Sequence, residues 1–508
     1  MILLIHKKNI VKEIIDLETN QLIKCTITKP IAALFFLADN YKDRLLVWCH
    51  QSLKPFLNKQ EIKKSFHLKN MMMSFSAHQY LPEQIGYVED SPFLKVNKNV
   101  KYPTWLMSSN VGVIYASQLL KFKNQVKEND SFDFVLNSIA KLGMPKGLFC
   151  YSDPKLLKET LIDVKVQASY YVLFKFVKLH YKGVWSVLLL LNFIIYDSKF
   201  LFLSFIKTVF IKKLNYEPCF SLEALSKPDF KDVTIDVIIP TIGRKDFLHD
   251  VLLDLEKQAL LPKKVIIVEQ NEVKNSKTEL DFISNKSWPF KIAHKFIHQT
   301  GACNARNLAL KSVTADYVYL ADDDNKFDKG LLKSIIQKMQ SFNFDVIAMS
   351  YLQKNEIEKN KKDIQWHAFG GGSSVIASKY LETVSFNMAY EFGYGEDTDF
   401  GMQLRNLGAD VIYTPDIKIL HLKAPIGGFR TKFIHPWEKH VDLKPKPSPT
   451  VMLSRMNNTT KQQLLGYKTG LFIKFYKDQD IINPFKYYTV FKKQWQESVS
   501  WANKLKKG

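Results

Sequence analysis

Arginine is scarce in this chain, and its scarcity narrows the anionic partners that a basic protein can have. The 508 residues include 72 lysines and arginines against 50 acidic residues, a formal net charge of +22, but only six of the 72 are arginines. Lysine cannot form the paired hydrogen bonds with which arginine reads guanine or clamps a phosphate. We therefore expect a lysine-covered surface beside an anionic neighbour, and no nucleic-acid partner.

Cysteine is also sparse. Five cysteines lie far apart without a Cys-x-x-Cys pair, which argues against a disulfide framework and against a structural zinc site. The first residues, MILLIHKKNIVKEIIDLE, contain a short apolar run, but charges follow the run and no small-residue cleavage site is present, so we expect no signal peptide. These features predict a cytoplasmic protein; any membrane contact would be peripheral, on the inner face of the plasma membrane.

No uninterrupted apolar run is long enough to span a membrane. In the most hydrophobic region, residues 165–214, the longest uncharged run is Val184–Tyr196, which Asp197 and Lys199 end, whereas a spanning helix needs about 20 apolar residues. Aromatic residues beside lysines in this region are typical of helices that lie on an anionic membrane surface. A buried helical hairpin that joins two domains explains the same pattern, and the sequence leaves both alternatives open.

Low-complexity stretches are absent, and the composition (46% apolar, 13% aromatic) is that of a globular protein. From Asp232, short apolar strands alternate with amphipathic helices, which is the pattern of a parallel α/β sheet with helices on both faces. The run KPKPSPT ends this pattern, and a basic helical tail follows. The predicted regions are a mixed α/β accessory domain at 1–160, a hydrophobic helical linker at 161–230, an α/β domain with the candidate site at 231–442, and a helical extension at 443–508.

Polar residues follow three of the predicted strands, at the edge where open parallel sheets bind their ligands. Pro240, Thr241 and Arg244 follow the first strand, Glu269 follows the second, and the three aspartates 322–324 follow the strand YVYL. Adjacent carboxylates repel one another unless a cation or hydrogen-bond donors offset the charge, and Mg²⁺ or Mn²⁺ bridges such carboxylates to substrate phosphates. A solvated acidic turn or a helix cap is the alternative explanation.

Five segments of the chain, in this order, resemble the family 2 glycosyltransferases, which have the GT-A fold. They lie within Asp236–His421 and read DVIIPTIGR, KKVIIVEQN, TGACNARNLALKSVTADYVYLADDDN, GYGEDTDFGMQLRNLGADVIYTPD and ILHL. The resemblance implies a Rossmann-like, mostly parallel sheet with helices on both faces. It also implies a metal-dependent inverting glycosyltransferase that moves a sugar from a nucleotide donor, a UDP-sugar by family habit, to a hydroxyl of a growing bacterial cell-surface glycan, free or lipid-linked.

The resemblance further implies a donor-binding set and a metal-binding pair. The donor set cradles the nucleotide, the ribose and the donor sugar: Pro240, Thr241, Arg244, Glu269, Arg306, Asp322 and Asp323. The metal pair would bind Mn²⁺ or Mg²⁺ and bridge it to the diphosphate: Asp324 and His421. Glu269 stands where the family usually has an aspartate that contacts the base, so the preferred base is not fixed by the resemblance.

A second carboxylate pair, Glu396 and Asp397, begins a predicted helix on the acceptor side. A sugar hydroxyl has too high a pKa to attack the donor carbon unaided, so a carboxylate must accept its proton. The resemblance assigns this general-base role to Asp397, and a helix-capping role is the alternative. The family also has a glycine loop near the acceptor, and we expect the corresponding acceptor-side residues to be Gly371, Gly372 and Trp366.

The N-terminal region contains a weak parallel to this pattern. Ser108–Phe122 followed by Asp130–Pro154 repeats the order of GGSSVIASKYL followed by DTDFGMQLRNLGADVIYTPD. Residues 1–160 are therefore predicted to form a degenerate GT-A-like domain without donor-binding parts, which binds acceptor glycan or stabilises a homodimer; an unrelated α/β domain is the alternative. For the whole chain, the alternative function is that of a catalytically inactive GT-A-like glycan-binding protein.

Overall fold

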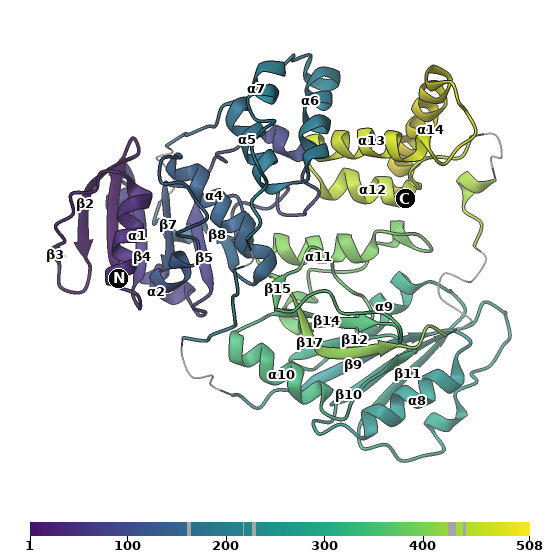
Figure 1. Cartoon of the computed structure of the whole chain (residues 1–508). Coiled ribbons are helices and arrows are strands. Elements are labelled where there is room, and N and C mark those ends of the chain that lie inside the picture. The colour runs from purple at the N-terminus through teal and green to yellow at the C-terminus, as the bar shows by residue number, and fades with distance from the viewer. Residues whose placement is uncertain (160–163, 217, 226–229, 425–432, 440–442, 508) are drawn as a thin grey trace. The chain divides into compact units, whose positions relative to one another are not determined.

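The computed structural model describes residues 1–159, 164–216, 218–225, 230–424, 433–439 and 443–507. The chain divides into two compact units, each with its own sheet (Figure 1). The first unit comprises Met1–Lys227, Lys362–Gln365 and Thr460–Ile473, and the second comprises Pro228–Lys361, Trp366–Thr459 and Lys474–Gly508. Among the described residues, no helix is both long enough and apolar enough to cross a membrane.

The second unit is built on a mixed sheet with the order β11-β10-β9-β12-β16-β14-β17-β13. The first four strands of this order run parallel, β16 runs antiparallel between β12 and β14, and β14 is parallel to β17. The strand bounds are β9 Ile235–Thr241, β10 Lys264–Gln270, β11 Lys291–Ile297, β12 Tyr317–Ala321, β13 Asn325–Lys326, β14 Val346–Leu352, β16 Ser373–Ala377 and β17 Val411–His421. This topology confirms the predicted α/β sheet of GT-A type.

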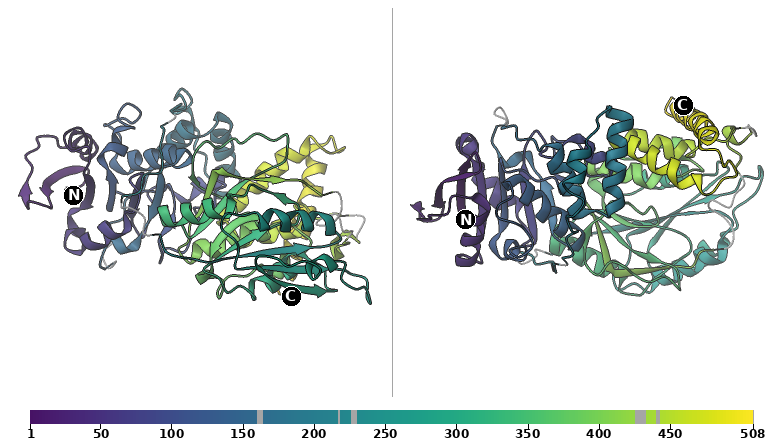
Figure 2. Two further views of the ribbon diagram at one scale, coloured as in Figure 1. Left: turned by 90° about the horizontal axis from the view of Figure 1, so that it is seen from below. Right: turned by 45° about the horizontal axis from the view of Figure 1, so that its top comes forward.

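Amphipathic helices cover this sheet because their apolar residues recur every three or four positions and form one buried stripe. Such stripes lie on α8 (Lys245–Glu256) and α10 (Leu331–Phe342). Two further helices, α9 (Ala302–Leu310) and α11 (Glu396–Asn406), carry polar residues of the candidate site. The C-terminal extension is helical, as predicted, and its α12 (Pro449–Asn458) packs against α14 (Pro484–Leu505). Figure 2 shows the sheets and helices from two further sides.

The first unit contains a second sheet, with the order β3-β2-β1-β4-β7-β5-β8-β6. Its bounds are β1 Ile2–Lys7, β2 Ile10–Asp16, β3 Gln21–Leu22, β4 Leu45–His50, β5 Met71–Phe75, β6 Tyr102–Pro103, β7 Val111–Tyr115 and β8 Phe149–Ser152, with helices α1 Pro30–Asn40, α2 Lys59–Ser65, α3 Ala116–Leu120 and α4 Phe132–Gly143. Five neighbouring strands, β1-β4-β7-β5-β8, repeat both the order and the parallel or antiparallel sense of β9-β12-β16-β14-β17. The two sheets thus share one five-strand pattern, and the degenerate GT-A-like character of residues 1–160 stays a prediction.

The hydrophobic region after this sheet forms three helices of the first unit: α5 (Tyr170–His180), α6 (Gly183–Asp197) and α7 (Phe202–Ile206) (Figure 1). One side of α5 and α6 is buried in the core of the unit. The α6 terminus is fixed there because Asp197 accepts hydrogen bonds from Gln84 and Tyr87. Most of α13 (Lys461–Tyr476) belongs to the same unit, where its Thr469 hydroxyl donates to Asn192.

Candidate active site

The three aspartates that follow β12 have three different environments. Asp322 is the most open, with 28% of its side chain exposed, whereas 3% of Asp323 and 4% of Asp324 is exposed. Because β9 and β12 are adjacent parallel strands, the residues that follow β9 meet these carboxylates directly. The structure therefore brings the two predicted strand-end segments together.

Asp323 links the loop after β12 to the end of β9. The Thr241 hydroxyl donates to its Oδ2 at 2.7 Å, and Arg244 Nη1 donates to its Oδ1 at 2.6 Å. Burial raises the pKa of Asp323 to about 6, although Arg244 and Thr241 act in the opposite direction. Both oxygens of this carboxylate are engaged within the protein, which gives Asp323 a role in holding Thr241 and Arg244 in place.

Asp324 and His421 form the pair predicted to bind a metal ion. Asp324 Oδ2 lies 3.6 Å from His421 Nε2, accepts the Ala424 amide at 2.9 Å, and lies 3.3 Å from Arg244 Nη1. Burial raises the pKa of Asp324, but these hydrogen bonds and charges together hold it below its ordinary value, so the carboxylate is ionised. Within the described residues no cluster of three or more metal-ligating side chains exists. An ionised carboxylate beside an imidazole fits a Mg²⁺ or Mn²⁺ ion that takes its remaining ligands from water and from a diphosphate.

Arg306 of α9 is buried between the aspartates that follow β12 and the carboxylates that begin α11. Its Nη2 donates to Asp322 Oδ1 at 3.0 Å. Burial lowers the pKa of this guanidinium, but the charges of Asp322, Asp397 and Glu396 outweigh burial and raise it. Arg306 is therefore a permanent positive charge that interacts with all three carboxylates. An arginine on the exposed surface of a helix would not have these three carboxylate partners.

A glycine loop runs past the same carboxylates. The Gly371 amide donates to Asp397 Oδ1 at 3.1 Å. A Cβ atom on Gly371 would lie 2.7 Å from that oxygen, and a Cβ atom on Gly372 would lie 2.0 Å from Asp322 Oδ2. Since real Cβ atoms do not approach so closely, only glycine allows the backbone to pass between Asp322 and Asp397. The predicted Gly371 and Gly372 thus belong to one constellation with both carboxylates.

Glu396 and Asp397 occupy the first turn of α11, which follows the left-handed residue Gly395. Burial raises the pKa of Glu396 to about 7, and the charge of Asp397 adds to the effect. Burial also raises the pKa of Asp397, although Arg306 and the Gly371 amide partly offset it. A carboxylate with a raised pKa is a stronger base, as a group that accepts a hydroxyl proton needs to be.

Glu269 lies at the end of β10, as predicted, and its side chain is buried. Its carboxylate accepts hydrogen bonds from the Thr278 hydroxyl and from the Glu279 amide, and it lies 2.9 Å from His294 Nε2. These contacts fix the loop that follows β10. Pro240 lies on β9 beside Thr241 and contributes no side-chain hydrogen bond.

Two residues of this region were not predicted from the sequence. The Tyr351 hydroxyl donates to Asp322 Oδ2 at 3.2 Å, and its ring stacks on the His421 ring with centroids 4.6 Å apart. Buried Arg405 of α11 donates to the Trp366 carbonyl at 2.5 Å and to the Ala368 carbonyl at 3.3 Å. Tyr351 is the next-to-last residue of an apolar strand and lies outside the quoted segments. Arg405 lies in the last turn of α11, inside the segment GYGEDTDFGMQLRNLGADVIYTPD, but the sequence alone assigned no role to it.

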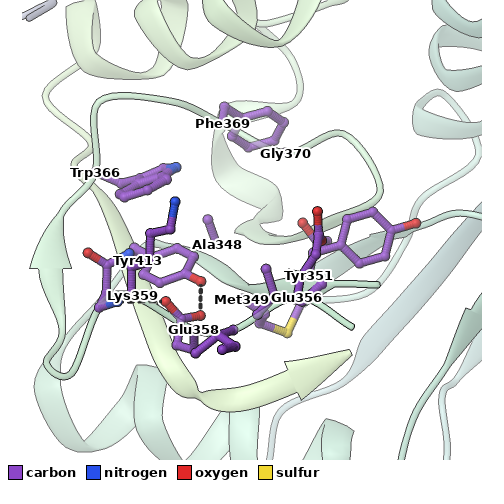
Figure 3. A pocket seen from close by; sticks show the side chains of 14 residues that line it. Ala348, Met349, Tyr351, Glu356, Glu358, Lys359, Trp366, Phe369, Gly370 and Tyr413 are labelled. Atoms are coloured by element: carbon purple, nitrogen blue, oxygen red, sulfur yellow. Dashed lines mark hydrogen bonds between the residues drawn. The ribbon is translucent and has the colours of Figure 1, made fainter. Parts of the chain in front are cut away.

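A cavity of about 430 Å³ opens beside Tyr351 (Figure 3). The predicted acceptor residue Trp366 lines it and stacks on Tyr413, with centroids 4.4 Å apart. Glu358, which accepts a hydrogen bond from Tyr413, lies below this aromatic pair in Figure 3. Gly370 also lines the cavity, so the cavity is continuous with the glycine loop.

The first unit contains the same kind of hydrogen bond between a loop amide and a helix carboxylate, but no aspartates follow the strand that is equivalent to β12. The Ser109 amide donates to Asp133 Oδ1 at 2.7 Å, at the second residue of α4, as the Gly371 amide does to Asp397 at the second residue of α11. In the first sheet Cys49 of β4 pairs with Val111 of β7, and in the second sheet Ala321 of β12 pairs with Ser373 of β16 at the equivalent position. In this register, the position of Asp322–Asp324 is held by the residues His50, Gln51 and Ser52.

Residues 236–396 match the family model described as glycosyl transferase family 2. The matched segment is about a third of the chain and runs from within β9 to the first residue of α11. An uncharacterized glycosyltransferase of Rickettsia felis is 25% identical over 176 residues, which cover 34% of this chain and 29% of the relative. The GalNAc(5)-diNAcBac-PP-undecaprenol β-1,3-glucosyltransferase of Campylobacter jejuni is 21% identical over 185 residues, covering 34% of this chain and 59% of the relative. The chain thus spans less than a third of the Rickettsia relative and somewhat more than half of the Campylobacter relative.

Solved structures also show partial similarity to this chain. The S. aureus TarS fragment 1–349 in complex with UDP-GlcNAc has 15% sequence identity and a TM-score of 0.35, and the alignment covers 46% of this chain and 70% of that one. The structure of GalNAc-T7 with UDP, GalNAc and Mn²⁺ has 12% identity and a TM-score of 0.31 over 37% of this chain and 44% of that one.

Proposed function

We propose that the glycosyltransferase domain is an inverting, metal-dependent enzyme that transfers a sugar from a nucleotide-sugar donor to a hydroxyl of a growing glycan. One observation carries the proposal: buried Arg306 and the glycine loop join Asp322 on the donor side to Asp397 on the acceptor side. A structural acidic turn or helix cap would not need a buried arginine and a glycine loop between the carboxylate that follows β12 and the one that begins α11.

In the proposed reaction, Asp397 accepts the proton of the attacking hydroxyl. The hydroxyl oxygen forms a bond to the donor carbon while the bond from that carbon to the diphosphate oxygen breaks, and the electron pair leaves with the nucleoside diphosphate. Attack from the side opposite the leaving group inverts the anomeric configuration. Burial favours this step, since it raises the pKa of Asp397 and makes the carboxylate a better proton acceptor. Arg306 holds Asp322 in place for the donor.

Asp324 and His421 are the residues that would hold Mn²⁺ or Mg²⁺. The ion supplies positive charge that stabilises the departing diphosphate. Arg244 ion-pairs with both Asp323 and Asp324 and is partly buried, so it places a second positive charge at the same edge of the sheet. Thr241 and Pro240 complete the first-strand side of the proposed nucleotide site.

The donor and acceptor classes are part of this proposal. We propose a UDP-sugar as donor and a cell-surface glycan, free or lipid-linked, as acceptor. The name of the Campylobacter relative, a glucosyltransferase for an undecaprenol-linked glycan, supports a lipid-linked acceptor. We place the acceptor in the cavity beside Trp366 and Tyr351, because this cavity adjoins the glycine loop. An acceptor on a lipid would place the enzyme at the inner face of the plasma membrane.

A donor screen tests the proposal. The release of nucleoside diphosphate is measured from UDP-, GDP- and dTDP-sugars with Mn²⁺ or Mg²⁺, and then after addition of EDTA. We expect slow hydrolysis of one donor that EDTA stops, and a product of inverted configuration when the acceptor is present. No release from any donor, together with no calorimetric binding, would instead support the inactive glycan-binding alternative.

A further inference from the structure

The side of α6 and α7 that faces away from the core of the first unit exposes large apolar side chains to solvent. Val184, Val187 and Ile195 form one stripe along α6, spaced by multiples of about one helical turn. The chain from Phe200 onward, which includes α7, continues this surface, and in most of the following residues more than half of the area is exposed: Phe200 72%, Phe202 49%, Leu203 76%, Ile206 56%, Val209 39% and Phe210 90%. We call these residues the 184–210 face.

This face is not explained by the folding of the first unit. The opposite side of α6 already buries Leu189, Leu190 and Phe193 in the core, so the helix does not need its outer residues to fold. Single exposed apolar residues are common on protein surfaces, but large apolar patches mark places where something binds. Nine large apolar side chains within 27 consecutive residues indicate such a place.

The positive charge around the 184–210 face indicates which kind of partner it binds. Residues 164–216 contain eight lysines and one acidic residue, Asp197, which is engaged by Gln84 and Tyr87. Lys199, Lys207, Lys212 and Lys213 are all exposed next to the apolar residues. A second copy of this chain would bring lysines against lysines, which is unfavourable. An anionic bilayer offers an apolar interior and negative head groups together, so it complements both features at once.

The lengths of the helices decide the mode of contact. α6 has 15 residues and α7 has five, whereas a spanning helix needs about 20. The two helices therefore lie in the interface, with apolar side chains inserted at the level of the acyl chains and lysine ammonium groups at the level of the phosphates.

We propose that the 184–210 face binds the surface of an anionic lipid bilayer. The proposal combines the two alternatives that the sequence left open, because one side of the helices is core and the other is a membrane-binding surface. It rests on the first unit alone and does not depend on the proposed transferase activity. A membrane-bound first unit would hold the chain where lipid-linked acceptors are found.

Sedimentation of the full chain with vesicles tests this proposal. The vesicles consist of phosphatidylcholine alone or of phosphatidylcholine with phosphatidylserine. We expect binding to the anionic vesicles and weak binding to the neutral ones. The variant Phe200→Ser/Leu203→Ser/Phe210→Ser removes three of the most exposed side chains and should weaken binding about 100-fold or more, since each buried apolar side chain of this size contributes about tenfold. Circular dichroism verifies that the variant is folded.

Two further variants separate the contribution of the apolar side chains of this face from that of its lysines. Leu22→Ser/Val273→Ser changes two exposed apolar residues elsewhere in the chain, 71% and 61% exposed, and should leave vesicle binding unchanged. Lys207→Gln/Lys212→Gln/Lys213→Gln should remove the preference for phosphatidylserine, because each lysine near an anionic surface contributes about fivefold. Equal vesicle binding by the wild type and the serine triple variant would overturn the proposal. So would a wild type that ignores vesicles but dimerises through this face in analytical ultracentrifugation.

Discussion

One added methyl group at Gly372 tests whether Asp322 must lie where the structure has it. In Gly372→Ala the Cβ atom would lie 2.0 Å from Asp322 Oδ2 and 2.3 Å from its Cγ, whereas ordinary van der Waals contact begins at 3.4 Å. Asp322 cannot simply turn aside, because its Oδ1 accepts a hydrogen bond from Arg306 and its Oδ2 accepts one from Tyr351. The backbone at Gly372 suits alanine, so the strain falls on the carboxylate rather than on the loop.

The expected loss follows from the interaction that the methyl group breaks. A hydrogen bond between charged partners contributes about 1.5–3 kcal/mol, which corresponds to about 10- to 150-fold in donor affinity. We therefore expect the KM for the donor to rise by that factor in a nucleoside diphosphate release assay. Gly470→Ala on α13 is the matched control, since a Cβ atom there meets nothing within 4 Å. An unchanged donor KM in folded Gly372→Ala would refute the placement of Asp322 in the donor site.

Three further predictions address the metal pair, the base and its neighbour. Asp324→Asn should abolish metal-dependent turnover and metal-dependent donor binding, as measured by calorimetry with and without Mn²⁺; full metal-dependent activity in this variant would remove Asp324 from the metal site. Asp397→Asn should lower kcat by about 10²-fold or more with donor affinity nearly unchanged, whereas Asp133→Asn, at the same helix position in the first unit, should leave kcat unaltered; loss of donor binding instead would make Asp397 a structural cap. The folded state raises the pKa of Glu396 from 4.5 to about 7, so the wild type should lose on the order of 1–3 kcal/mol of unfolding free energy as pH rises through that range. Glu396→Gln should lack this loss, and denaturant unfolding at about pH 4 and about pH 8 would reveal it; identical pH dependence in both proteins would contradict the raised pKa.

The sequence predicted the sheet of the second unit and the positions of its strand-end residues because both are local properties. Apolar alternation marks a strand, and the residue after a strand end is adjacent to it in the chain. Thr241 and Asp322 could therefore be assigned to one edge of the sheet from the order of residues alone.

Contacts between side chains distant in the chain could not be predicted in the same way. The engagement of both Asp323 oxygens depends on the side-chain conformations of Thr241 and Arg244, which lie 82 and 79 residues away. The roles of Tyr351 and Arg405 depend equally on tertiary packing, since their partners lie 29 and 39 residues distant. The 184–210 face needed the structure for another reason: an apolar helix has two sides, and only packing determines which one is covered.

The repeated five-strand pattern allows the two units of this chain to be compared position by position. Where β12 of the second sheet is followed by Asp322–Asp324, the equivalent positions of the first sheet hold His50, Gln51 and Ser52. The hydrogen bond from the Ser109 amide to Asp133 nevertheless matches the one from the Gly371 amide to Asp397. The strand order and the loop-to-helix hydrogen bond therefore occur in both units, whereas the three aspartates occur at this position only in the second. Under the proposed function, the first unit is an internal reference in which the same backbone contact can be changed without touching the proposed reaction.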